Sequence, residues 1–217
     1  MITTPDLIDS LVAGAKPVRR LRPPAARAAL WLLFAAVIVS LLAVSHGLRP
    51  DLEARLSQPS FVTGLAASLL TGALAAVAAF IVSLPDRSRL WLLLPMPALG
   101  LWISTISYGC LTEWTSIRPG GVSLGEAVDC LATLVLTSVP LWLGLLLMLR
   151  HAAFLFSASV AAAGSLAVAA LAATALSLFH GLDASAMILM WNLGAAALLV
   201  GLGSAFGERM FSWVASR

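Results

Sequence analysis

Charged side chains are scarce in this sequence: Asp, Glu, Lys and Arg make up 11% of its 217 residues, whereas 60% of the residues are hydrophobic. The mean hydropathy is +0.99, which lies well outside the range of soluble globular proteins. We therefore expect the chain to fold in a lipid bilayer.

The sequence also lacks the motifs of the common enzyme classes. It contains no HExxH pair, no Walker loop and no GxSxG elbow, and its two cysteines do not form a CxxC motif. Hydrolase, nucleotide-binding and thioredoxin-like activities therefore have no support. The apolar runs have no ionisable residue near their middle, where pumps and ion-coupled carriers usually place one. The sequence thus indicates a protein that is not an enzyme, and it disfavours a small transporter or channel.

Long apolar runs dominate what is present. A membrane-spanning helix needs about 20 apolar residues, and six runs are long enough: roughly 28–47, 61–83, 89–109, 125–149, 153–179 and 184–206. They predict an all-α fold, a six-helix transmembrane bundle over residues 25–217 preceded by a cytoplasmic N-terminal segment over residues 1–24. The first run is not a signal peptide, because it lies too far from the N-terminus and is long enough to span.

Positive charge predicts the orientation of the chain. When the N-terminus is placed inside, ten of the thirteen Lys and Arg residues lie on the cytoplasmic side, as the positive-inside rule requires. We therefore expect a multi-pass protein of the bacterial inner membrane with both termini in the cytoplasm.

Glycine and proline predict details of the spans. Gly109 is expected to end the third span as a left-handed C-cap, which would leave Cys110 to Leu124 in an external loop. Pro95, Pro97 and Pro140 are expected to kink the third and fourth spans, because proline removes a backbone donor. Small residues crowd the second and fifth runs and predict close helix contacts there.

The two cysteines and their polar neighbours are the candidates for chemistry on the outer face. Cys110 follows the third run, and Cys130 lies about 10 Å into the fourth span at about 1.5 Å per residue. The two thiols could form a disulfide or remain free in the bundle. Alternatively, the protein could be a membrane thiol oxidoreductase that uses both thiols. They could also join a metal or redox-sensing site with the neighbouring side chains His46, Asp129, His180 and Asp183.

The first 24 residues predict a partner-binding helix. Thr4 and Pro5 are suited to start a helix, which Pro17 ends, and its apolar residues repeat at helical spacing. The opposite face is acidic, which favours a protein groove over anionic lipid. The basic stretch after Pro17 is expected to contact lipid headgroups. The residues expected to contact the partner are Asp6, Leu7, Ile8, Leu11 and Val12.

The N-terminal string TPDLIDSLVAGAKPVRRLRPP, the six-span layout, and the segment SYGCLTEW ahead of LGEAVDCL resemble the NrsF family, negative regulators of extracytoplasmic-function sigma factors. The resemblance covers nearly the whole chain. It implies an anti-sigma factor whose N-terminal segment holds a sigma factor at the membrane until a signal reaches the bundle. It implies no resident cofactor, and its partners would be the sigma factor and membrane lipids, without direct contact with nucleic acid.

The resemblance also implies a sensing mechanism. Family members respond to metal or oxidative stress through one cysteine in the fourth span and one at the external end of the fifth. Cys130 matches the first, whereas the second position falls at about Gly181. Three alternatives remain: Cys130 acts alone, Cys130 acts with Cys110, or a site at His180 and Asp183 replaces the second cysteine. The signal would be a transient metal ion held by Cys130 and His180. The adjacent Asp129 disfavours the Cys130 thiolate, and a soft cation would favour it.

Overall fold

The computed structural model describes Thr4, Asp9, Val12 and Ala13, and residues 22–84, 86–113, 124–149 and 158–179. All of the elements in these ranges are helical, which confirms the all-α prediction for this part of the chain. They are α2 (Pro24–His46), α3 (Leu52–Leu56), α4 (Pro59–Val82), the 3-10 helix η1 (Arg89–Leu93), α5 (Met96–Glu113), α6 (Leu124–Leu149) and α7 (Ala158–Phe179).

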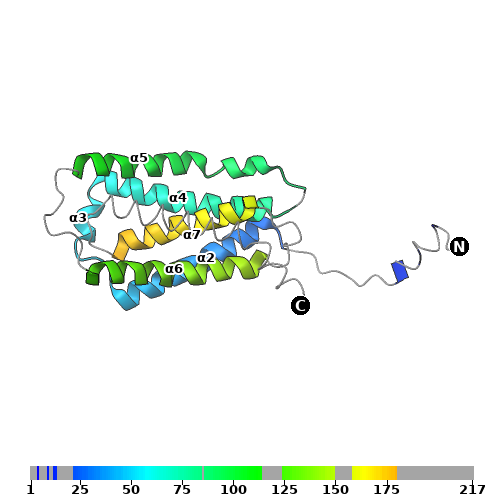
Figure 1. Ribbon diagram of the computed structural model, residues 1–217, viewed down its shortest axis with the longest axis horizontal. Coiled ribbons are helices and arrows are strands. Elements are labelled where there is room, and N and C mark those ends of the chain that lie inside the picture. Colours follow the sequence, from blue (N-terminus) through cyan, green and yellow to red (C-terminus); the bar gives the residue numbers. More distant parts are fainter. Residues whose placement is uncertain are drawn as a thin grey trace.

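The long helices form a bundle in which successive helices run in opposite directions (Figure 1). Helix α7 is the central helix: 72% of the residues in its most apolar stretch are buried, compared with 11% for the stretch that joins η1 to α5. Helix α5 accordingly lies at the edge of the bundle, against α4. Its exposed side chains are mostly apolar, as a lipid-facing helix requires.

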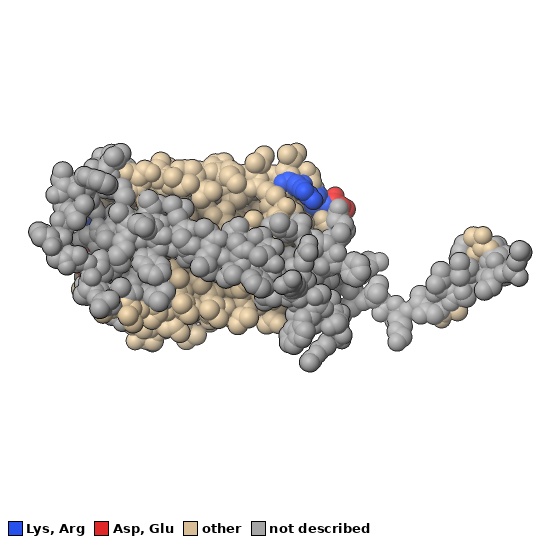
Figure 2. Space-filling view, in the orientation of Figure 1, with Lys and Arg blue, Asp and Glu red and all other residues tan. Residues whose placement is uncertain are grey.

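Five helical segments are long and apolar enough to cross a membrane within the described ranges. They are Pro24–His46, Pro59–Val82, Arg89–Ser107, Ala132–Leu149 and Ser159–Phe179, and they correspond to the first five predicted spans. The sixth predicted span, residues 184–206, lies outside the described residues. In Figure 2 the clearly visible charged side chains lie at one end of this face, and the described flank beside them is uncharged. Many large apolar side chains are exposed on the long helices, which suits contact with lipid.

The prolines of the bundle differ in how far they interrupt a helix. Pro24 occupies the first turn of α2, where its missing N–H costs nothing. The third span is interrupted at Pro95, between η1 and α5, and Pro97 lies in the first turn of α5. Pro140 lies inside α6, which continues through it. The proline effect is therefore strongest at Pro95, where the 3-10 turn gives way to an α-helix.

The predicted end of the third span at Gly109 is wrong. Helix α5 continues to Glu113, so Cys110 lies in its last turn rather than in a loop. A glycine ends a helix when it adopts a positive φ, and among the described residues only Gly47 does so, with φ of 78° after α2. Gly109 remains helical, since glycine weakens a helix by about 1 kcal/mol without having to end it.

Small residues bring α4 and α7 close together, as predicted. A Cβ added at Gly72 would lie 2.9 Å from Leu171 Cγ and 3.3 Å from the Ala167 carbonyl oxygen. About one turn away, the hydroxyls of Ser68 and Thr174 are hydrogen-bonded at 2.9 Å. Close backbone approach and polar pairs of this kind stabilise helix association in membranes, where the hydrophobic effect contributes little.

Candidate functional site at the start of α2

The described part of the chain has its most distinctive polar contacts where the N-terminal segment enters the bundle. Helix α2 begins at Pro24, and Arg27 in its first turn donates its backbone N–H to the Pro23 carbonyl oxygen at 3.1 Å. Helices α4 and α6 end at this same end of the bundle, because Arg27 contacts both. We call it the Arg27 end, and the end where α2 finishes the Arg49 end.

The Arg27 side chain is a cation enclosed by the bundle. It is 6% exposed, and its Nη2 donates a hydrogen bond to the carbonyl oxygen of Met148. Met148 precedes the last residue of α6, and the final four carbonyl oxygens of a helix have no partner within it. Arg27 therefore caps α6 and places a positive charge at the negative end of its dipole.

The Arg27 guanidinium also lies over the ring of Phe80, at 5.1 Å from the centroid. Phe80 is a buried residue near the end of α4, so the cation joins three helices through a hydrogen bond and a cation–π contact. Its second terminal nitrogen, Nη1, is buried and has no hydrogen-bond partner among the described residues. The two terminal nitrogens thus differ: Nη2 is hydrogen-bonded to α6 and Nη1 is not.

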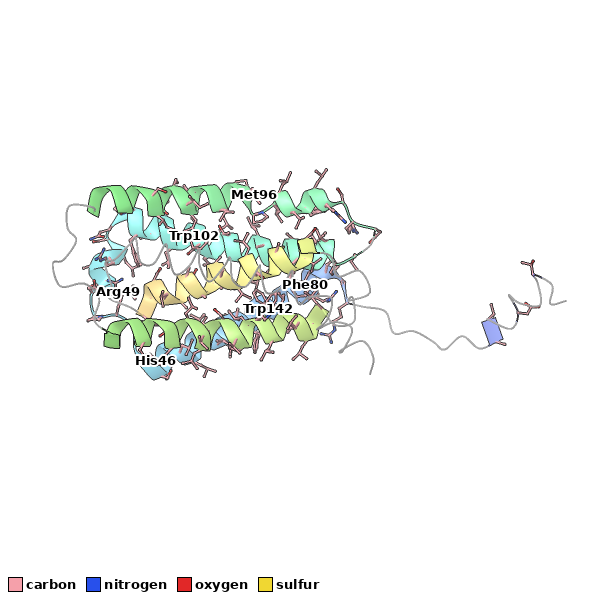
Figure 3. The ribbon with its side chains drawn as sticks, in the orientation of Figure 1. His46, Arg49, Phe80, Met96, Trp102 and Trp142 are labelled. Carbon is pink, nitrogen blue, oxygen red and sulfur yellow. The ribbon has the colours of Figure 1, made fainter. Side chains whose placement is uncertain are left out.

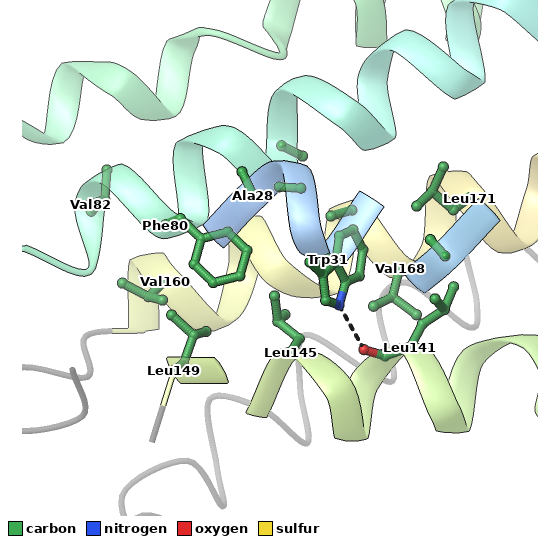
Figure 4. Close-up of a cluster of buried hydrophobic side chains, with 14 residues drawn as sticks. Ala28, Trp31, Phe80, Val82, Leu141, Leu145, Leu149, Val160, Val168 and Leu171 are labelled. Atoms are coloured by element: carbon green, nitrogen blue, oxygen red, sulfur yellow. Dashed lines mark hydrogen bonds between the residues drawn. The ribbon is translucent and has the colours of Figure 1, made fainter. Parts of the chain in front are cut away.

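Two further side chains extend the contact between α2 and α6. Trp31 is fully buried and donates its Nε1–H to the Leu141 carbonyl oxygen at 3.1 Å (Figure 4). Phe34 packs against Gly144, where an added Cβ would lie 2.8 Å from Phe34 Cε1. Arg27, Trp31 and Phe34 succeed one another at spacings of four and three residues, which puts them on one face of α2. We call this face, with Met148, Leu141 and Gly144, the α2–α6 seam.

The seam adjoins the main hydrophobic core. Figure 4 shows Trp31 and Phe80 among buried side chains contributed by α2, α4, α6 and α7. Leu145 and Leu149 of α6 and Val168 of α7 are almost fully buried in the same cluster. A tightly packed core transmits a displacement rather than absorbing it, so a shift of α6 would also displace α2.

The Arg49 end has its own buried cation. Arg49 is 5% exposed at its side chain and donates Nε and Nη2 to the two carboxylate oxygens of Asp51 at 2.6 and 2.7 Å. Its backbone N–H donates to the Leu178 carbonyl oxygen in the last turn of α7 at 3.1 Å. The guanidinium lies 5.9 Å from the centre of the Phe61 ring of α4. Arg49 therefore ties the loop after α2 to α4 and α7.

The Arg49 hydrogen bonds lower the pKa of Asp51 from 3.8 to about 2. Arg55 adds a weaker contact to the same carboxylate at 3.5 Å. Figure 3 shows Arg49 and His46 toward one end of the bundle and Phe80 toward the other. His46 is exposed at the end of α2, and the described residues contain no group of three or more His, Cys, Asp or Glu side chains able to hold a metal ion.

The predicted sensing residues are placed only by their backbones or lie outside the described residues. Cys110 is in the last turn of α5, and Cys130 is the seventh residue of α6. His180 and Asp183 lie outside the described residues, as does Gly181. The proposed metal pair, Cys130 and His180, therefore stays a prediction.

The predicted partner-binding residues are described at one position. Val12 is helical and 68% exposed, which leaves its side chain free to contact another molecule. Asp6, Leu7, Ile8 and Leu11 lie outside the described residues.

The seam was not predicted from the sequence. Arg27 was counted only as a positive charge for orientation, and no role was predicted for Trp31 or Phe34. The available signal was their helical spacing directly after Pro23 and Pro24, which places an arginine and two aromatic rings on one face of the first span. An arginine enclosed on that face needs a partner, and a helix end offers one.

A family model described as NrsF, negative regulator of sigma F, matches residues 11–213. The match begins within the N-terminal segment and includes every long helix of the bundle. No curated protein and no solved structure matches the chain.

Proposed function

Because the chain belongs to the NrsF family, the negative regulators of sigma F, we propose that it is a membrane-bound anti-sigma factor for an extracytoplasmic-function sigma factor. Residues 1–24 sequester the sigma factor at the inner membrane, and residues 25–217 form the sensor that releases it under metal or oxidative stress. The observation that carries the proposal is the family match over residues 11–213, which includes the second half of the predicted binding segment and all the long helices of the bundle.

The position of the binding segment supports the separation of binding from sensing. Val12 is helical and exposed, and the bundle begins only at Pro24. Arg27, Arg87 and Arg89 all lie at or beside the Arg27 end, where α4 finishes and η1 starts. Positive charge favours the cytoplasmic side, so this end would face the compartment that holds the sigma factor.

The sensor would lie at the other end of α6. Cys130 and Met148 belong to one helix and are separated by about 27 Å at about 1.5 Å per residue. A change at Cys130, with Cys110, His180 or Asp183 as its partner, would therefore act on the helix that Arg27 caps. Helix α6 gives the proposal a physical connection between signal and release.

The test is co-purification of the sigma factor with the full-length protein from membranes. Replacing Leu7 and Leu11 with Asp should abolish capture, because burial of each carboxylate in an apolar groove would weaken the binding free energy by about 2 kcal/mol or more. The matched control replaces Ser10 and Ala13 with Asp, which adds the same charge outside the apolar stripe of Leu7, Ile8, Leu11 and Val12, at about 100° per residue. Sigma capture that survives the Leu7 and Leu11 changes would refute this function.

A further inference from the structure

We propose that Arg27 is a positioning residue that links the state of α6 to the sigma-binding segment through the α2–α6 seam. With the seam closed, the first turn of α2 is fixed to the end of α6, and residues 1–24 are held in the arrangement that captures the partner. Displacement of α6 opens the seam and weakens capture. This inference rests on the proposed function and adds the residue through which the bundle acts on its N-terminal segment.

The first support is the place of Arg27 in the chain. It lies three residues after Pro24, and its backbone N–H is bonded to the Pro23 carbonyl oxygen. Pro23 has φ of −51° and ψ of 143°, and the ring of each proline restricts φ. Because this junction is stiff, a rotation of the first turn of α2 changes the direction in which the binding segment leaves the bundle.

The second support is the kind of contact that the seam makes. Arg27 and Trp31 both donate to backbone carbonyl oxygens of α6, and Phe34 packs on a glycine. These three contacts are therefore made to the α6 backbone. A rigid shift or rotation of α6 moves all three contacts together, whichever residue at the far end of the helix starts it.

The third support is the unpaired Nη1 of Arg27. Nη1 is buried without a hydrogen-bond partner among the described residues, and a buried unpaired donor raises the free energy of the state that contains it. The closed seam holds Arg27 by one hydrogen bond and one ring contact while this donor stays unused. A rearrangement that gave Nη1 a partner would recover this free energy and offset part of the cost of opening the seam.

Arg27→Gln in the full-length protein tests the link directly. It removes the charge and the ring contact, and we expect the affinity for the sigma factor to fall about tenfold, as for loss of one charge-assisted hydrogen bond. Sigma-dependent transcription in unstressed cells should rise, and the additional rise under stress should shrink. Arg27→Lys keeps the charge but not the planar guanidinium, so it should restore part of the difference.

Gly144→Ala supplies a second variant that changes no charge. Its Cβ would lie 2.8 Å from Phe34 Cε1, so the Phe34 ring must leave its place on α6. We expect loss of this contact to loosen the seam and raise unstressed transcription, as Arg27→Gln does. The control is Gly72→Ala, where the Cβ would meet Leu171 and the Ala167 backbone between α4 and α7. Gly72→Ala should lower the melting temperature of the purified protein at least as much, while leaving sigma affinity unchanged.

Three results separate this inference from its premise. If the Leu7 and Leu11 double variant still captures the sigma factor, the proposed function fails. If that variant loses capture while Arg27→Gln and Gly144→Ala keep full affinity and normal transcription, the function stands and the positioning role of Arg27 is refuted. If Gly72→Ala reduces affinity as much as Gly144→Ala, general loss of packing explains both and the specific role of the seam is refuted.

Discussion

At the scale of single residues, two arginines show how the bundle accommodates buried charge. Arg27 is held by a helix end and an aromatic ring, whereas Arg49 is held by the Asp51 carboxylate and the Phe61 ring. Both lie at helix ends, where charge is less costly than at the bilayer centre. Their partners differ because a helix C-terminus offers carbonyl oxygens, while the loop after α2 offers a carboxylate.

The Arg49–Asp51 pair should persist in acid. A carboxyl whose pKa is lowered on folding stabilises the folded state above its unfolded pKa, and this contribution is lost as pH falls through the folded pKa. With the Asp51 pKa at about 2 and its ordinary value at 3.8, Asp51→Asn should lower the melting temperature by a constant amount above about pH 4. The difference should shrink between pH 4 and pH 2.

Thermal melts of the purified protein across this range measure the effect. The control is Glu53→Gln, which removes an exposed carboxylate two residues away. A melting-temperature difference for Asp51→Asn that grows as pH falls would contradict the assigned direction.

Trp31 should contribute to stability through its indole N–H as well as its size. Trp31→Phe keeps a ring in the core but removes the hydrogen bond to the Leu141 carbonyl oxygen, and we expect a loss of about 1–2 kcal/mol in unfolding free energy. Trp31→Ala should cost about 3–5 kcal/mol, because it leaves a cavity. Unfolding of the purified protein in mixed micelles measures both.

The matched control for Trp31 is Trp91→Phe. Trp91 is exposed in η1, so its replacement should change the unfolding free energy by less than about 0.5 kcal/mol. Equal losses at the two tryptophans would show that the hydrogen bond on the seam adds nothing.

At the scale of helices, α6 is distinctive because it carries Cys130 near one end and the Arg27 contact at the other, and it packs against α2 and α7. Helix α4 has a different role: it packs along α7 and provides Phe80 and Phe61 to the two arginines. The first arrangement suits transmission along one rigid helix. The second suits a fixed frame for the movement that we propose for α6.

Cys130→Ser tests α6 as the sensing helix. Sigma capture should remain intact in unstressed cells, while release under metal or oxidative stress should be blocked, because serine does not supply a soft thiolate. The reporter of sigma-dependent transcription, with and without stress, is the measurement. Cys110→Ser and His180→Ala test the substitute partners in the same assay. A normal stress response in Cys130→Ser would place the sensor elsewhere.

How far the sequence predicts this fold depends on the range of the interaction. Runs of apolar residues predict a helix from local composition, so α6 begins at Leu124 and ends at Leu149, within one residue of expectation. The prediction at Gly109 is wrong because glycine permits a helix to end but does not require it. The seam was missed because the contacts of Arg27 with Met148 and of Phe34 with Gly144 join residues more than a hundred positions apart. No local pattern specifies which helices become neighbours.

At the scale of the whole molecule, the distribution of charge between the two ends predicts orientation. Arg27, Arg87 and Arg89 lie at or near the Arg27 end, whereas Arg49 and Arg55 at the opposite end share the Asp51 carboxylate. The excess of positive charge at the Arg27 end favours the cytoplasm. With that end inside, the last turn of α5 and the first turns of α6 face the periplasm.

A membrane-impermeant thiol reagent tests this orientation, using variants that keep one cysteine each. Cys110 is in the last turn of α5, whereas Cys130 is about two turns into α6, or about 10 Å from its start at about 1.5 Å per residue. In intact spheroplasts the reagent should therefore label Cys110 more readily than Cys130, and inverted vesicles should show weaker labelling of Cys110. Denatured samples of each variant measure full reactivity and serve as the control. Labelling of Cys110 only in inverted vesicles would reverse the orientation, and it would place the Arg27 end, with the sigma-binding segment, on the side of the membrane that lacks RNA polymerase.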